Sequence, residues 1–484
     1  MTQKHPESPP FLDFIVTPET SQTFPKNHCG VRVTRSPAIK NPLYLQMVPE
    51  VIHGGGLVLA LFVAIVTAVP ILMGYWSIFS ATSPRLNEKV KVPGRPVEDY
   101  LHFHKESDRL RYRGRRRIAM EVFYEMYFRG DVEFKQGDCL DNLEYRHDWA
   151  SFSFSWGVFR HFLFGFIPEL IVHSRSQDEE QVGGNYDRGD DFYAWFLGPR
   201  MVYTSGIISD VDKEESLEKL QDNKLAVVCE KIGLKPGNSM LDIGCGWGAL
   251  ATFASVHYNA HVTGVTLGRN QTKWGNTTLR NAGIAESQSR TLRMDYRDCP
   301  RIPGGYKKIT SLGMSEHVGV RHFRGFLRQV YDMLDDDGLR KYWQYEDLIW
   351  GLFMNKYVFP GADASTPLGW LIDQLEAAGF EVKNIDTVGV HYSDTLWRWY
   401  RNWLANRENV MDKYGAKWYR IWEFFLSWAT IVSCQGGAAC YQIVLVKNLN
   451  STHRVEGVST QFGISGSIKS AFQRSGAVLS AYIP

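Results

Sequence analysis

The stretch that decides the fold is Met240-Leu241-Asp242-Ile243-Gly244-Cys245-Gly246-Trp247-Gly248. Its first half predicts a short buried strand, and the glycines predict a tight turn into a helix. Glycines let a backbone approach a ligand closely, and a helix N-terminus presents free N–H groups. The spacing is GxGxG, whereas dinucleotide folds place the third glycine further along. The stretch therefore fits S-adenosylmethionine (SAM), a compact nucleoside with a charged side chain, and Asp242 is a candidate to bind it.

The segments around this stretch alternate between strand-like and helix-like patterns. We expect strands over residues 239–243, 261–266, 308–313, 380–388 and 441–446, and helices over residues 219–232, 249–258, 271–282 and 322–334. This alternation predicts a parallel, Rossmann-like α/β sheet. Six tryptophans fall on further predicted helices, namely Trp397, Trp399, Trp403, Trp418, Trp422 and Trp428.

Ligands of an open α/β sheet lie outside the carboxyl ends of its strands. The second strand ends at Thr266 without an acidic residue, so Thr266 and Gln271 are the candidates to bind a ribose. The third strand leads to residues 295–298, where an adenine is expected. The fourth leads to Glu316 and His317, which are expected to face the substrate and to hold or move protons. The alternative for this pair is a surface carboxylate and a capping histidine.

Residues 54–79 contain no charged residue and predict a transmembrane helix, for which about 20 apolar residues suffice. Pro70 is tolerated better in a membrane span than in a soluble helix. Tyr75 and Trp76 stand near one end, as in an aromatic belt. Arginine and lysine gather between residues 85 and 117, so the positive-inside rule predicts that the rest of the chain faces the cytosol. The arginines could also hold anionic headgroups or form a solvated helix face.

Composition narrows the classes of function. The 54 basic and 52 acidic residues nearly balance, which argues against a nucleic-acid partner bound by bulk charge. The 7 cysteines include no CxxC pair and no zinc-type spacing, so we expect no structural metal and no disulfide scaffold.

Several short motifs carry a resemblance to a known superfamily. In chain order they are YDRGDDF (186–192), YTSG (203–206), LDIGCGWG (241–248), GVTLGRNQ (264–271), DYRD (295–298) and EHVG (316–319). Together they resemble the cyclopropane fatty acid synthases and mycolic acid methyltransferases. Longer stretches resemble the fungal sphingolipid C9-methyltransferases more closely: HDWASF (147–152), FPGADASTPLGW (359–370), GVHYSDTLWRWYRNW (389–403) and KNLNSTHRVEG (447–457).

The resemblance implies an activity and a location. It implies SAM-dependent methyl transfer to C9 of the Δ8 double bond of the sphingoid base of ceramide. The reaction passes through a carbocation and loss of a proton, and gives a 9-methyl sphingadienine on the route to glucosylceramide. The expected partners are the ceramide and a bilayer, and the expected location is the endoplasmic reticulum membrane.

The resemblance also implies site residues. The catalytic set is Glu316, His317 and Tyr392. The cofactor set is Tyr203, Thr204, Met240, Leu241, Asp242, Ile243, Gly244, Cys245, Gly246, Trp247, Gly248, Thr266, Leu267, Gly268, Arg269, Asn270, Gln271, Tyr296 and Arg297. Bacterial members bind bicarbonate as the base, through a Cys, a Glu that matches Glu316, a His on the fifth strand and a Tyr that matches Tyr392. Ser205 replaces that Cys here, which argues against bicarbonate.

The family pattern breaks after Gly338. A short apolar strand, the fifth of the sheet, is missing between Gly338 and Leu339. Its loss predicts an unpaired edge on the fourth strand. Either residues 339–343 take the vacant place, or the gap reflects an error in the deduced sequence.

We therefore expect five parts along the chain. They are a disordered tail (1–53), a transmembrane segment (54–80), a membrane-proximal adaptor and substrate-binding region (81–200), a SAM-dependent methyltransferase domain (201–450) and a C-terminal tail (451–484). Two alternatives to a sphingolipid C9-methyltransferase remain at this stage. One is a fatty-acyl cyclopropane synthase, and the other is an inactive, membrane-anchored paralogue.

Three Asn-x-Ser/Thr sequons, at Asn270, Asn276 and Asn450, test the predicted orientation. Such sites are modified only on the lumenal or outer side of a membrane. We expect all three to be unmodified, because the charge asymmetry places them in the cytosol. A glycosidase-dependent mass shift that maps to any of them would contradict this orientation.

Overall fold

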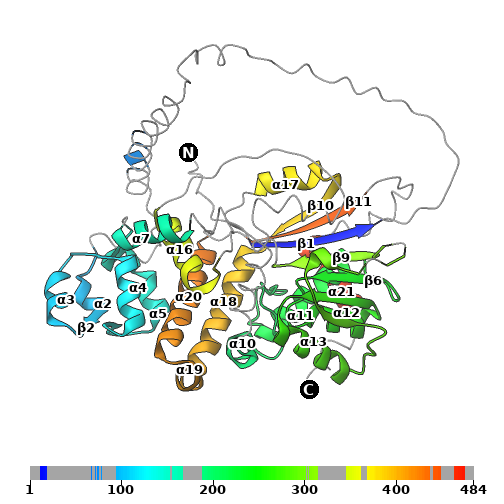
Figure 1. The fold of residues 1–484 in the computed structure, drawn as a ribbon, viewed down its shortest axis with the longest axis horizontal. Helices are drawn as coiled ribbons and strands as arrows, with labels where there is room; N and C mark the ends of the chain where they lie inside the picture. Colours follow the sequence, from blue (N-terminus) through cyan, green and yellow to red (C-terminus); the bar gives the residue numbers. More distant parts are fainter. Residues whose placement is uncertain are drawn as a thin grey trace, which may run out of the picture.

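The computed structural model describes residues 11–18, 67, 71, 74–75, 78, 94–152, 155–166, 188–300, 302–303, 305–313, 345–360, 368–435, 440–447 and 463–474. Within these residues the chain forms a seven-stranded sheet and a helical layer, which lie side by side along the long axis of the molecule (Figure 1).

The sheet has the strand order β10-β11-β1-β9-β6-β7-β8. Its strands are β1 (Phe11–Pro18), β6 (Ser239–Ile243), β7 (His261–Thr266), β8 (Arg290–Arg293), β9 (Lys308–Leu312), β10 (Phe380–Thr387) and β11 (Cys440–Lys447). Neighbours β9, β6, β7 and β8 are parallel, as the sequence predicts. The expectation of a uniformly parallel sheet is wrong at β11 and β1, which run in the opposite direction, because β1 pairs antiparallel with β9 and parallel with β11.

Helices cover the two faces of the sheet, and alternate residues of β6 reach each face. Met240 packs in the apolar cluster that includes residues of α11 (Leu217–Lys231) and α12 (Ala249–Tyr258). Leu241 and Ile243 pack in the cluster that includes residues of α17 (Leu368–Ala377). The remaining helix beside these strands, α13 (Arg269–Asn281), packs on β7 and β8. Strand β6 is therefore buried on both faces, as expected for a central parallel strand.

Strand β1 occupies the place where the sequence predicts a missing strand. Residues Asp13 to Val16 pair with Leu312 to Ile309 of β9, and the whole of β1 pairs with the whole of β11. The segment FLDFIVTP is rich in β-branched and aromatic residues, which favour strands, and it ends at a proline, which cannot donate to a ladder. The prediction of a wholly disordered tail over residues 1–53 is therefore wrong for this segment. Residues 339–343, the other candidate for the vacant place, lie outside the described residues.

This pairing constrains the predicted transmembrane segment. Strand β1 precedes residues 54–79 in the chain, and all other strands of the sheet follow them. A single membrane crossing would separate β1 from its partners. Both ends of the segment therefore have to lie on the same side of any bilayer that it enters. Residues 54–79 fall almost entirely outside the described residues, and among the helices that are described none is long and apolar enough to cross a membrane.

The helical layer is built from two regions of the chain. The first supplies the helices α2 (Val97–Tyr100), α3 (Glu106–Arg111), α4 (Met120–Arg129), α5 (Cys139–Glu144), α6 (Arg146–Trp149), α7 (Trp156–His161) and α10 (Asp190–Leu197), and the π-helix η1 (Phe162–Phe166). It also contains two short strand pairs. Strand β2 (Leu101–Phe103) pairs with β4 (Val132–Phe134), and β3 (Ile118–Ala119) pairs with β5 (Ala150–Ser151). The second supplies α16 (Tyr345–Phe353), the π-helix η3 (Met354–Val358), α18 (Gly389–Ala405), α19 (Arg407–Tyr414) and α20 (Ala416–Cys434).

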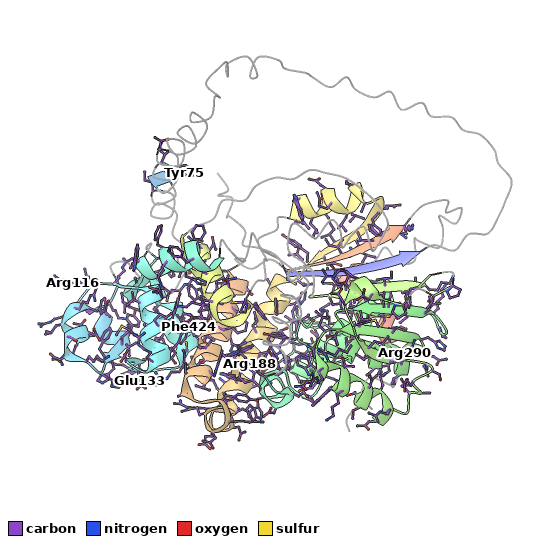
Figure 2. The ribbon with its side chains drawn as sticks, in the orientation of Figure 1. Tyr75, Arg116, Glu133, Arg188, Arg290 and Phe424 are labelled. Carbon is purple, nitrogen blue, oxygen red and sulfur yellow. The ribbon has the colours of Figure 1, made fainter. Side chains whose placement is uncertain are left out.

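Aromatic packing holds this layer together. Helix α20 contacts α4, α5, α18 and α19. Phe424 on α20 is fully buried, and its ring lies 5.1 Å from that of Phe353 and 5.2 Å from that of Trp428 (Figure 2). The described parts of the predicted adaptor, residues 94–152, 155–166 and 188–200, thus share one apolar core with α16, α18, α19 and α20.

The C-terminal region also departs from its prediction. Helix α21 (Ile464–Arg474) packs on α11 of the methyltransferase domain, so residues 451–484 are not simply a tail. Ser467 and Ile468 are buried in this contact.

Strand β1 yields a prediction about stability. Deleting residues 11–18 should lower the melting temperature, because β9 and β11 lose backbone hydrogen-bond partners at about 1–3 kcal/mol for each group that stays buried. Deleting residues 2–9 is the matched control, because it shortens the same terminus without touching the paired strand. Equal melting temperatures for both deletions would show that β1 does not complete the sheet.

Candidate active site

The turn after β6 has the geometry of a ligand-binding loop. Gly244, Gly246 and Gly248 all have positive φ, at 75°, 52° and 78°. A Cβ on Gly246 would meet no described atom within 4 Å, whereas a Cβ on Gly248 would lie 3.0 Å from Gly275 Cα. Gly246 therefore faces open space beside the turn, and Gly248 is needed for packing against α13. An open glycine at the carboxyl end of the first parallel strand fits the close approach of a SAM molecule.

Trp247 anchors this turn to the helical layer. Its indole Nε1–H donates to Asp190 Oδ1 across 2.8 Å, and its ring lies 5.0 Å from that of Tyr193. Both partners are on α10. The turn is thus fixed relative to α10 by a hydrogen bond and a ring contact, and the indole is buried.

Asp242 is the penultimate residue of β6 and is buried. Its Oδ1 accepts a hydrogen bond of 2.8 Å from Thr310 Oγ1, on the neighbouring strand β9. Thr310 is fully buried and pairs with Asp242 in register. The hydroxyl therefore orients the carboxylate at the carboxyl edge of the sheet.

Three other predicted residues of this stretch are buried, and Cys245 is half-buried. Met240, Leu241 and Ile243 belong to the apolar core, so only their backbone could contact a ligand. Burial raises the pKa of the Cys245 thiol well above its usual range. Cys245 is therefore a neutral packing residue and a poor nucleophile.

The predicted ribose pair is preorganised. Thr266 Oγ1 donates to Gln271 Oε1 across 2.6 Å and accepts from the Gly268 backbone N–H at 3.3 Å. Both side chains are buried. The hydroxyl of Thr266 is thus engaged within the protein, and the amide nitrogen of Gln271 is the better donor for a ribose. Arg269 is exposed at the start of α13, and Leu267 and Asn270 are partly buried.

The predicted adenine segment forms the short helix η2 (Tyr296–Asp298). Arg297 makes two hydrogen bonds to the buried Asp295, of 2.8 Å and 2.6 Å, and its guanidinium lies 5.2 Å from the Tyr296 ring centroid. Arg297 is therefore a positioning residue for this segment. Tyr296 packs against the apolar cluster on the α17 face of the sheet and offers the ring surface there.

Tyr203 and Thr204 lie beside α10 and α11. Thr204 Oγ1 accepts a hydrogen bond of 2.7 Å from the buried ammonium of Lys224 on α11. The Tyr203 ring lies 5.7 Å from that of Tyr193, which also contacts Trp247. The structure thus connects Tyr203 to the glycine turn through one intervening ring.

An aromatic cluster continues from Tyr203 into the helical layer. Its rings form a closed circuit of contacts at centroid distances of 5.1–6.0 Å, in the order Tyr203, Phe196, Trp422, Phe425, Phe359 and back to Tyr203. Trp399 joins this circuit through Tyr203 at 5.5 Å, and the predicted catalytic Tyr392 lies 5.9 Å from Trp399. The structure therefore brings Tyr392 and Tyr203 to the same cluster, on the side of the molecule that carries the glycine turn.

The segment after Tyr203 is fastened to α18. Ser205 is buried and donates to the Gly206 carbonyl oxygen across 2.7 Å. The Gly206 N–H donates to Thr395 Oγ1 at 2.9 Å, and the Ile208 N–H donates to His391 Nδ1 at 3.1 Å. Burial lowers the pKa of His391, in agreement with its neutral, accepting Nδ1.

The remaining predicted catalytic residues, Glu316 and His317, lie outside the described residues, so their roles stay predictions. Strand β9 ends at Leu312, and Gly313 follows it with a φ of 65°. Among the described residues, no group of three His, Cys, Asp or Glu side chains is placed to hold a metal ion.

Several residues that shape the site carry no clear signal in the sequence. Asp190 lies within the YDRGDDF motif, yet nothing in the sequence shows that it accepts from Trp247. Phe196, Phe359 and Phe425 come from three distant segments and meet only in the folded chain. A pairing of such aromatic positions between related sequences is the signal that could have found them.

Comparison with known proteins decides the family. The family model of mycolic acid cyclopropane synthetase matches residues 173–443. The chain is 66% identical to sphingolipid C9-methyltransferase A of Emericella nidulans, over 97% of this chain and 96% of that protein. It is 63% identical to the sphingolipid C9-methyltransferase of Komagataella phaffii, over 86% and 87% of the two chains.

The chain belongs to the sphingolipid C9-methyltransferase family. It is therefore a methyltransferase of the cyclopropane synthase superfamily, as the motifs predict. Among solved structures, the cyclopropane synthase MmaA2 from Mycobacterium tuberculosis shares the fold, with a TM-score of 0.50 at 24% identity, over 55% of this chain and 97% of that one. The predicted α/β methyltransferase fold is confirmed, whereas the predicted transmembrane helix stays a prediction.

The open glycine of the turn generates a prediction for this methyltransferase. Gly246→Asn should lower the affinity for SAM at least about tenfold with little change in melting temperature. Asparagine tolerates a positive φ, and its side chain would enter the open space. Gly246→Val should bind SAM no more tightly than Gly246→Asn does, and it should also have a lower melting temperature because valine is strained at a positive φ.

Gly237→Asn is the matched control, because Gly237 has a φ of 77° and equally open surroundings. Titration calorimetry with SAM and thermal unfolding give the two readouts. Unchanged SAM affinity in Gly246→Asn would show that this turn does not hold the ligand.

Proposed function

We propose that this chain transfers the methyl group of SAM to C9 of the Δ8 double bond in the sphingoid base of ceramide. Relatives at 61–66% identity are named sphingolipid C9-methyltransferases. The observation on the molecule that supports the proposal is the junction between the glycine turn and the aromatic cluster. Tyr193 contacts both Trp247 of the turn and Tyr203 of the cluster.

The proposed reaction moves one methyl group from SAM to the alkene and releases one proton. SAM is consumed as a substrate and supplies an electrophilic methyl group. The π electrons of C8=C9 form the new C9–C bond while the sulfur–carbon bond breaks and its electrons stay on sulfur. The cation at C8 then loses the proton of C9, which restores the C8=C9 double bond.

The aromatic cluster suits the cationic step. An alkene and a carbocation need a dry site, because water would capture the cation. Tyr203 is half-buried, while Phe196, Trp399 and Trp422 are almost fully buried. The negative faces of such rings attract a cation electrostatically. The cluster can therefore exclude water and favour positive charge near the acceptor carbon.

The base for the lost proton is the remaining requirement. Glu316 follows the strand β9, whose carboxyl end adjoins that of β6, so a carboxylate shortly after it can reach the substrate side of the sheet. The changed residue at Ser205, which is buried and bonded to a backbone carbonyl, supports a base other than bicarbonate.

We place the enzyme on the endoplasmic reticulum membrane with the methyltransferase domain in the cytosol, where SAM is available. The lipid substrate and the uncharged residues 54–79 support a membrane location. The pairing of β1 with β9 and β11 supports an arrangement in which residues 54–79 enter and leave the bilayer on the cytosolic side.

The test uses membranes that contain the full chain, methyl-labelled SAM and ceramide with a Δ8-unsaturated base. We expect label in the unsaturated ceramide and none in its Δ8-saturated counterpart, because only the alkene can attack. Label in the saturated lipid, or in neither lipid, would contradict the proposed function.

The variant Glu316→Gln tests the base. It should keep the affinity for SAM and lower turnover about 10²–10⁴-fold, the usual contribution of positioned proton transfer. Unchanged turnover in this variant would exclude Glu316 as the base.

A further inference from the structure

Helix α7 and the π-helix η1 expose an unusually apolar surface. Trp156 is 73% exposed, Phe164 is 71% exposed and Phe159 is 39% exposed. The rings of Trp156 and Phe159 stack at 5.5 Å, so they form one patch. Residues 155–166 contain no acidic side chain, and Arg160 is exposed among the rings. We name Trp156, Phe159, Arg160 and Phe164 the α7 patch.

The opposite side of α7 is fixed to the protein. Val158 is buried, and α7 contacts α4 and α16. Ser155 caps the helix by accepting from the Val158 N–H at 3.2 Å, and its hydroxyl donates to Glu121 at 2.8 Å. A Cβ on Gly157 would lie only 2.2 Å from the Glu121 carboxylate, which shows how closely α7 approaches α4. The patch is therefore held outward by a rigid scaffold.

Exposed basic residues precede the strand pair that is connected to α7. Arg115, Arg116 and Arg117 are all exposed and directly precede β3. Strand β3 pairs with β5, the strand that leads into α7. Exposed aromatic rings with flanking arginines are the composition of surfaces that enter the headgroup region of a bilayer. Tyr75, near the end of the uncharged residues 54–79, lies beyond the same edge of the molecule at which α7 is drawn (Figures 1 and 2).

The α7 patch is also connected to the aromatic cluster. His161, at the end of α7, lies 3.2 Å from Asn355 Oδ1 on η3. Helix η3 leads directly to Phe359, whose ring contacts those of Tyr203 and Phe425. The π-helix η3, of a kind that often marks functional sites, therefore connects the end of α7 to the aromatic cluster.

We propose that the α7 patch docks on the lipid bilayer, with Trp156, Phe159 and Phe164 inserted at headgroup depth and the arginines on anionic headgroups. The choice of a bilayer as the occupant rests on the proposed function, because the acceptor chain must leave a membrane to reach the aromatic cluster. The patch marks the side of the enzyme through which that chain enters.

Depth-resolved fluorescence tests the docking independently of catalysis. An environment-sensitive dye is attached to Trp156→Cys or Phe164→Cys in the full chain, reconstituted in phosphatidylcholine–phosphatidylserine vesicles that carry a quencher on the acyl chains. We expect a blue shift and quenching at both positions. Val211→Cys, at a residue that is 90% exposed on the methyltransferase domain, should show neither, and the labelled unsubstituted chain corrects for the 7 native cysteines.

Activity gives the second readout. Trp156→Ser with Phe164→Ser should lower methylation of vesicle-embedded ceramide about tenfold, and leave methylation of a short-chain, water-dispersed ceramide unchanged. Dye that stays water-exposed would overturn the proposal. A blue shift that depends on protein concentration without quenching by lipid would also overturn it, and would assign the patch to contacts between copies of the chain. Quenching without any methyl transfer would keep the docking surface and contradict only the proposed function.

Discussion

The hydrogen bond from the Trp247 indole to Asp190 joins the two layers of this molecule at the point where their functions meet. Trp247 belongs to the glycine turn of the sheet, and Asp190 begins α10 of the helical layer. From α10, Phe196 packs directly on Trp399 and Trp422. A displacement of this contact would move the glycine turn relative to the rings of the aromatic cluster. Methyl transfer requires the acceptor carbon, the methyl carbon and the departing sulfur of SAM to lie in line, with the two carbons close together. The position of one layer relative to the other therefore matters as much as either site alone.

The sheet shows how an edge with unpaired backbone groups is completed. Strand β9 carries the segment that leads to Glu316, and it lacks a parallel neighbour on its outer side. Buried N–H and C=O groups need partners, and β1 supplies them from a distant part of the chain, in the opposite direction. Because the hydrogen bonds join backbone groups, a strand from any part of the chain and in either direction can supply them. One consequence concerns the membrane, because the pairing holds both flanks of residues 54–79 on the same side.

The sequence predicts the sheet well and the helical layer poorly, for physical reasons. The bounds of β6, α12 and β7 agree with the predicted ranges, because a buried strand, a glycine turn and a helix each leave a local pattern. The roles of Asp190 and Thr310 depend on contacts 57 and 68 residues away along the chain, which no local pattern records. The short helices α4, α5 and α7 pack on α16 or α20, and helices of this length leave only a weak periodic pattern in the sequence. The local pattern of β1 does not show that it joins this sheet, because its partner β9 lies almost 300 residues further along the chain.

The proposed function implies one chemical outcome, methyl addition with retention of the alkene. The measurement that tests it most directly supplies SAM with a fully deuterated methyl group and determines the deuterium content of the lipid product by mass spectrometry. If the proton is lost from C9 of the sphingoid chain, the product retains all three deuterium atoms in a branched alkene. A product with two deuterium atoms would mean that the proton came from the new methyl group, as in cyclopropane formation, and would contradict the account.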